Sequence, residues 1–164
     1  MRKVSRHGIQ GATFGVMEGT VMMLGVLLGL SVTGDRFIIV LGLLTAGIAD
    51  AFANSSSFYV SEESEMIHTR AEVWKAAKLC FLATLGVVAL MTVPLLAIRN
   101  TSVSMIVSVA VGLVVLFVLG IYMAKKLKSK TPSSTVIKYV LIGTVTAVAC
   151  FIIGELLEYI APVF

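Results

Sequence analysis

The sequence predicts an all-α membrane protein with five transmembrane helices, its N-terminus in the cytoplasm and its C-terminus outside. Three observations lead to this prediction. The 164 residues are 58% hydrophobic and only 13% charged, about half the charged share of a soluble domain, and the mean hydropathy is +1.01. The apolar residues fall into five blocks of at least about 20 residues, enough to cross a ~30 Å hydrocarbon layer. Nearly all Lys and Arg residues fall on one side of the predicted bundle.

The five expected spans cover residues 8–33, 37–60, 76–98, 103–124 and 139–160. The first block is too long for a signal-peptide core and lacks a small-residue cleavage site after it, so it is expected to remain as a span. Tight turns at 34–36 and 99–101 join two pairs of spans. The polar stretch 61–78 is expected to continue as helix beyond the membrane, and 125–134 is a basic loop. No gap can hold a soluble domain, so residues 1–164 form a single five-helix domain.

The distribution of basic residues sets the predicted orientation. Arg36 and Arg99 lie on one side of the membrane. The other side carries eleven: Arg2, Lys3, Arg6, Arg70, Lys75, Lys78, Lys125, Lys126, Lys128, Lys130 and Lys138. The richer side is expected to face the cytoplasm. The net charge of +4 therefore reflects topology, and no nucleic-acid partner is expected.

No catalytic chemistry is evident in the sequence. The chain has no P-loop, HExxH, nucleophile-elbow or dinucleotide-binding motif, so an enzyme is not expected. Its two cysteines, Cys80 and Cys150, are isolated in apolar blocks and are interpreted as small buried residues. No cofactor is expected.

Two acids lie deep inside the first two predicted spans. Glu18 and Asp50 are each ten residues from the cytoplasmic end of their block, roughly 15 Å deep at ~1.5 Å per residue. A tight turn makes these spans neighbours, so the two carboxylates are expected to meet near the midplane. Each acid costs a few kcal/mol there, which makes a functional role the default interpretation.

The helical faces of these acids extend the pattern. Asn54, Ser57 and Ser61 continue from Asp50 as a polar stripe, and Met22 lies one turn after Glu18. The predicted metal ligands are Glu18, Met22, Asp50 and Asn54; the predicted cytoplasmic entrance is Ser57, Ser61, Glu62 and Glu65. Carboxylate and amide oxygens with a thioether suit Fe²⁺ or Mn²⁺. The alternatives are that the acids pair with helix dipoles, hydroxyls or a shared proton, and that Met22 only packs.

Some features allow two interpretations. Gly11, Gly15 and Gly19, like Gly25 and Gly29, recur every four residues and allow close helix packing, inside the bundle or at a dimer interface. Glu155 and Glu158 are an exit station or interfacial acids. His7 and His68 are interpreted as interfacial.

Four stretches together resemble the vacuolar iron transporter family. "FGVMEGTVMMLGVLLGL" is similar to its first helix, "AGIADAFANSSSFYVSEESE" to its second, "ATLGVVALMTVPLLAI" to its third and "VIKYVLIGTVTAVACFIIGELL" to its fifth. The resemblance covers nearly the whole chain and implies the five-helix topology deduced above.

The resemblance implies a homodimer that exports Fe²⁺ or Mn²⁺ from the cytosol in exchange for protons. Glu18 then corresponds to the translocation ligand, a glutamate where aspartate is usual, and Asn54 replaces the usual methionine. Asp50 stands where a small residue is expected. Longer relatives insert a glutamate-rich metal-binding domain between helices 2 and 3, whereas this chain has only residues 61–78.

The expected function is therefore metal export by competition between metal and protons for the same carboxylates. A proton held by one acid when the site is empty would leave as metal arrives. The alternatives are a scaffold or assembly subunit that does not transport, or a transporter of another cation such as Ca²⁺. A prokaryotic plasma membrane is the expected location.

Overall fold

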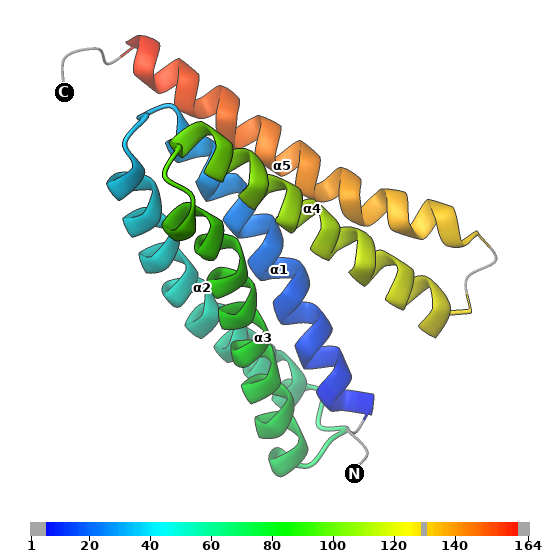
Figure 1. Ribbon diagram of the computed structural model, residues 1–164. Coiled ribbons are helices and arrows are strands. Elements are labelled where there is room, and N and C mark those ends of the chain that lie inside the picture. The colour runs from blue at the N-terminus through cyan, green and yellow to red at the C-terminus, as the bar shows by residue number, and fades with distance from the viewer. Residues whose placement is uncertain (1–5, 129–130, 161–164) are drawn as a thin grey trace.

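Five long helices make up the described part of the chain, residues 6–128 and 131–160 of the computed structural model (Figure 1). They are α1 (Arg6–Ser31), α2 (Arg36–Ser64), α3 (Arg70–Ala97), α4 (Thr101–Lys126) and α5 (Pro132–Ile160). All five are long and apolar enough to cross a membrane, and the described residues contain no strand. The predicted all-α, five-span fold class is confirmed.

Local capping explains where the helices begin. The Asp35 side chain accepts hydrogen bonds from the backbone N–H groups of Phe37 (2.7 Å) and Ile38 (3.3 Å), which starts α2. Gly34 precedes it at φ 63°, a left-handed conformation that glycine adopts without strain. The Asn100 side chain accepts from Val103 N–H at 3.0 Å and starts α4. These two short turns match the predicted ones.

The helices α2, α3, α4 and α5 extend beyond the predicted spans into the polar stretches that connect them. α2 continues to Ser64 and α3 already begins at Arg70, so most of stretch 61–78 is helical, as expected. The predicted basic loop 125–134 is shorter, because α4 includes Lys126 and α5 begins at Pro132, where proline suits the first helical turn. Arg2, Lys3 and Lys130, which count toward the predicted cytoplasmic side, lie outside the described residues.

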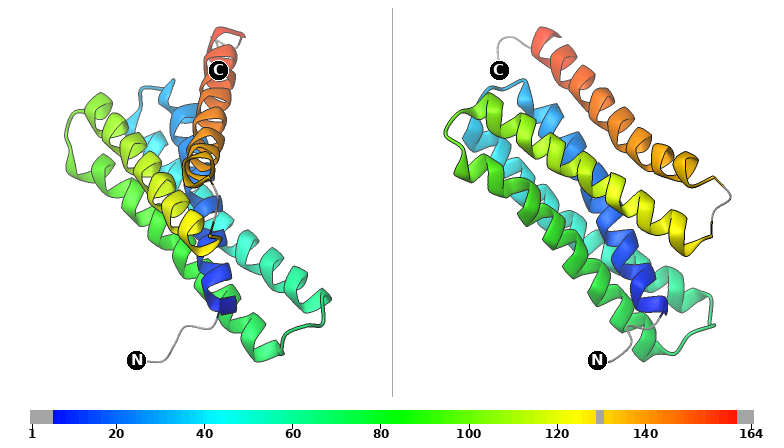
Figure 2. Two further views of the ribbon diagram at one scale, coloured as in Figure 1. Left: turned by 90° about the vertical axis from the view of Figure 1, so that its right-hand side faces the viewer. Right: turned by 45° about the vertical axis from the view of Figure 1, so that its right-hand side comes forward.

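Helix α1 occupies the centre of the bundle and contacts each of the other four helices. Figure 2 shows α5 on one side of the molecule, beside α1 and α4. The start of α1 lies beside the α2–α3 connection, while the end of α5 lies at the opposite end of the molecule (Figure 1). The two ends of the described chain therefore lie on opposite sides of the bundle, as an odd number of spans requires.

Glycines set the distance between α1 and its neighbours. A Cβ at Gly11 or Gly15 would collide with the backbone carbonyl oxygen of Ala76 or Cys80 on α3. Near the other end of α1, Gly25 and Gly29 face Cys150 on α5. Both glycine series are therefore used within the chain, and the tight-bundle interpretation is the one that the structure supports.

The outside of the bundle is apolar. The main core joins buried side chains of all five helices, among them Leu24, Leu43, Met91, Leu116 and Ala147. Large apolar side chains are nevertheless exposed on every helix, for example Phe14, Phe52, Leu82, Val118 and Ile152. An apolar exterior around five spanning helices identifies an integral membrane protein.

Candidate metal centre

The predicted pair of acids lies at the middle of two neighbouring helices. Glu18 is at the centre of the 26-residue α1, and Asp50 is at the centre of the 29-residue α2. The two helices pack against each other. Asp50 is half-buried and Glu18 is exposed on the surface of the single chain. That the two carboxylates meet there stays a prediction from the hairpin, and the contact between α1 and α2 supports it.

Asn54 completes the Asp50 side of this site. Its Nδ2 donates a hydrogen bond to Asp50 Oδ2 at 2.9 Å, between residues one helical turn apart. This bond orients the carboxylate and occupies one of its oxygens. Asn54 thus lies in the position where it could serve as a neutral oxygen ligand, or as the group that positions Asp50.

A third helix contributes at the same level. The Cys80 thiol on α3 is buried. The three side chains do not form a compact ligand set, because elsewhere than at His7, Glu62 and His68 the described residues hold no three such ligand atoms within 4.8 Å of one another. A metal ion between Glu18 and Asp50 would therefore need further ligands, from water, Asn54 or a second chain.

Met22 does not lie freely beside Glu18. It is partly buried and packs against the main hydrophobic core. The alternative that this methionine only packs gains support from that contact.

The predicted entrance divides into exposed and buried members. Ser57, Ser61 and Glu65 are exposed, with Glu65 just after the last residue of α2. Glu62 is different: it is only 6% exposed and points into the interior. The neighbouring Glu63 forms an ion pair with exposed Arg70, with Arg70 Nε 3.1 Å from Glu63 Oε1.

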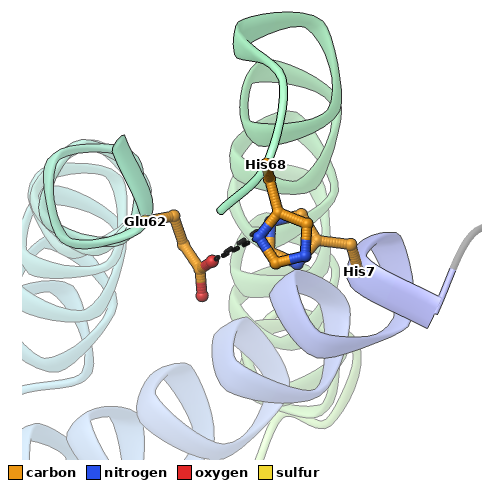
Figure 3. Close-up of side chains that lie close together, drawn as sticks. All are labelled: His7, Glu62 and His68. Atoms are coloured by element: carbon orange, nitrogen blue, oxygen red, sulfur yellow. Dashed lines mark ion pairs between the residues drawn. The ribbon is translucent and has the colours of Figure 1, made fainter. Parts of the chain in front are cut away.

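Polar groups from α1 and from the α2–α3 connection surround Glu62, and Figure 3 shows the two histidines among them. Gln10 Nε2 on α1 donates to Glu62 Oε1 at 2.7 Å. The other oxygen, Oε2, lies 3.2 Å from His7 Nε2 and 3.6 Å from His68 Nδ1. His68 belongs to the short connection between α2 and α3. We call His7, Glu62 and His68 the histidine–glutamate cluster.

Aromatic contacts hold this cluster in place. The His7 and His68 rings are stacked, with centroids 3.8 Å apart and planes at 21°. His7 also packs near Phe58, at 6.2 Å between centroids, and Phe58 belongs to a small core with Ala76 and Cys80. His7 is therefore an interior side chain, only 6% exposed, close to the start of α1, and its position at the membrane interface stays a prediction.

The number and placement of the histidines in the sequence point to this cluster. The chain has only two histidines, and the charge distribution already assigned the N-terminus and stretch 61–78 to the same side of the membrane. Their convergence on Glu62 depends on the start of α1 packing against α3 through Gly11, and that partner was not predictable from glycine spacing alone.

Glu155 and Glu158 lie on the exposed surface of α5, near its end. Their exposure agrees with interfacial acids that reach water.

The chain matches no family model, no curated protein and no solved structure. The resemblance to the vacuolar iron transporter family thus stays a prediction from the quoted stretches.

Proposed function

We propose that this protein exports a divalent transition metal ion, Fe²⁺ or Mn²⁺, from the cytosol in exchange for protons. The observation that carries the proposal is the placement of Glu18 and Asp50 at the centres of two helices that pack against each other. Two carboxylates at this depth repel each other and are costly to keep charged in a membrane. A divalent cation between them removes both costs.

Competition between metal and protons follows from the same pair. With no metal bound, a proton on one carboxylate relieves the repulsion. Metal arriving from the cytoplasm displaces that proton, and protons from outside then displace the metal. The polar stripe from Ser61 to Asn54 offers oxygen atoms along the way to Asp50. The excess of Lys and Arg at the N-terminal side supports a cytoplasmic entrance there.

The exposure of Glu18 favours a homodimer. In a single chain this acid lies at the middle of α1 on the outer surface, where it would face lipid. A second copy placed against this face would exclude lipid and bring a second Glu18 to the pathway. It would also add ligands that one chain lacks.

The scaffold alternative has less support. A scaffold subunit that binds a partner through glycine faces needs those faces to be free. Here Gly11 and Gly15 pack against α3, and Gly25 and Gly29 pack against α5. Both glycine series of α1 are therefore occupied within the chain.

Metal flux into proteoliposomes under an imposed pH gradient tests the proposal. Glu18→Gln and Asp50→Asn should each reduce Fe²⁺ or Mn²⁺ flux at least about tenfold, the loss expected for about 1.4 kcal/mol of binding free energy. Glu158→Gln is the matched control, because it neutralises an exposed acid outside the site. Flux unaffected by Glu18→Gln excludes that residue, and flux that ignores the pH gradient excludes proton coupling.

Competition among cations in the same assay identifies the substrate. Fe²⁺ and Mn²⁺ should inhibit each other's flux more strongly than Ca²⁺ does. Stronger inhibition by Ca²⁺ would instead identify a transporter of that ion.

A further inference from the structure

We propose that His7, Glu62 and His68 form a second metal site, which binds a divalent transition metal ion such as Zn²⁺, Co²⁺ or Fe²⁺ at the end of the bundle. Each residue offers one ligand atom, and all three atoms lie within 4.8 Å of one another. Two imidazole nitrogens and one carboxylate oxygen are a donor set that these ions favour. The site is separate from the Glu18–Asp50 pair and does not depend on transport.

The distances fit a tetrahedral ion. Metal–ligand bonds of about 2.0–2.1 Å at tetrahedral angles separate neighbouring ligand atoms by about 3.3 Å. Glu62 Oε2 lies 3.2 Å from His7 Nε2 and 3.6 Å from His68 Nδ1. Small side-chain movements would therefore bring both pairs to the spacing of ligands on a common ion.

His7 supplies the second, independent observation. Its Nε2 is buried and has no hydrogen-bond partner, although Glu62 Oε2 lies only 3.2 Å away. A buried polar atom without a partner is unfavourable. Two ligands of one ion show this same relation, because each directs its lone pair at the ion and not at the other ligand. A metal ion would satisfy the His7 nitrogen.

The neighbours of Glu62 orient its carboxylate as a metal ligand. Gln10 donates to Oε1, so the carboxylate is oriented with Oε2 toward both histidines (Figure 3). Outer contacts of this kind fix the geometry of metal ligands. Phe58 lies beside His7 and is itself only 6% exposed, which limits access of water from that side.

Binding requires one ring to turn. The His7 and His68 rings are stacked at 21°, and nearly parallel rings cannot both direct an in-plane lone pair at one ion. His68 can make the movement, because its side chain is 34% exposed and lies in the connection before α3. Metal binding would thus replace the ring stack with coordination, and three protein ligands would leave a fourth position for water.

Co²⁺ alone, titrated into the full chain in detergent after removal of any polyhistidine tag, tests the site. Four-coordinate Co²⁺ absorbs visible light far more strongly than six-coordinate Co²⁺ does. The wild type should develop this band. His68→Ala and Glu62→Gln should weaken Co²⁺ binding at least about tenfold, since even outer-shell changes cost that much. His68→Ala changes an exposed side chain, so the result stands even if Glu62→Gln fails to fold.

Two control variants test whether the Co²⁺ band comes from this site, and not from a neighbouring acid or from the proposed transport site. Glu63→Gln removes the adjacent, more exposed acid and should leave the band unchanged. The double variant Glu18→Gln/Asp50→Asn should also keep it, even if transport is lost. No band in the wild type, an unchanged band in His68→Ala, or loss of the band only in the double variant would each overturn the proposal.

Histidine labelling gives a second readout. Because the chain contains only two histidines, ¹⁵N-histidine NMR reports both proposed ligands without further assignment. Zn²⁺ alone should shift a ring nitrogen of each histidine together. A shift of neither, or of only one, contradicts coordination by the pair.

Discussion

Glu62 and Asp50 are carboxylates about three turns apart on the same helix, yet their surroundings have opposite electrostatic character. Glu62 is buried, accepts a hydrogen bond from Gln10 and lies beside two histidine nitrogens. Asp50 has one donor, Asn54, and a second acid, Glu18, nearby. The first site is largely complementary without a ligand, whereas the second is repulsive until a cation or proton arrives.

This difference predicts opposite changes in stability when the acid is removed from each site. Removing an acid from a complementary site should destabilise the protein, because its partners are left unpaired in the interior. Removing an acid from a self-repulsive site should not, because a source of repulsion disappears. The sign of the stability change therefore distinguishes the two kinds of site, even before any metal is added.

Both sites depend on the packing of α1 against α3, so breaking that packing should have the largest effect. Gly15→Val places side-chain atoms against the Cys80 carbonyl and should lower the free energy of unfolding by about 3 kcal/mol, the upper range for overpacking. Chemical unfolding in mixed micelles measures this change. Gly86→Val is the control, because nothing lies within 4 Å of a Cβ there. Equal losses in the two variants would contradict the assigned contact.

Glu62→Gln should have the next largest effect. The amide keeps a carbonyl oxygen for Gln10 but loses the charge that faces both histidines, so we expect a loss of about 2 kcal/mol in the same assay. Glu63→Gln, which affects the exposed pair with Arg70, should cost less than about 0.5 kcal/mol. Similar values for the two variants would mean that burial of Glu62 does not matter.

Asp50→Asn should give the smallest change and the opposite sign. In the presence of a chelator, removing one of two repelling acids should leave the free energy of unfolding unchanged or raise it by up to about 1 kcal/mol. The amide is similar in size and can still pair with Asn54. A loss as large as that of Glu62→Gln would show that Asp50 is a structural residue.

The predicted parts of the fold are those that depend on local sequence. Five apolar blocks and two capped turns fix the spans, and the short turn before Asp35 makes α1 and α2 neighbours, with Glu18 and Asp50 each at the middle of its helix. The ends of the spans were less predictable. Charged residues such as Lys126 continue a helix as well as apolar ones do, so hydropathy underestimates helix length there.

The unpredicted parts depend on contacts between distant segments. His7 and Glu62 are brought together because Gly11 lets α1 approach Ala76 on α3. Glycine spacing predicts a close contact but not which helix provides it. Met22 shows the same limit, since its position on the helix fits a ligand and its observed packing fits the core equally well.

The most direct test of the central claim is the position of a bound ion. Anomalous scattering from crystals of the full chain soaked in Mn²⁺ would locate it without assuming any ligand. The account predicts a peak between Glu18 and Asp50 at the middle of the membrane-spanning region. Anomalous density confined to the histidine–glutamate cluster, or absent from the chain altogether, would contradict it.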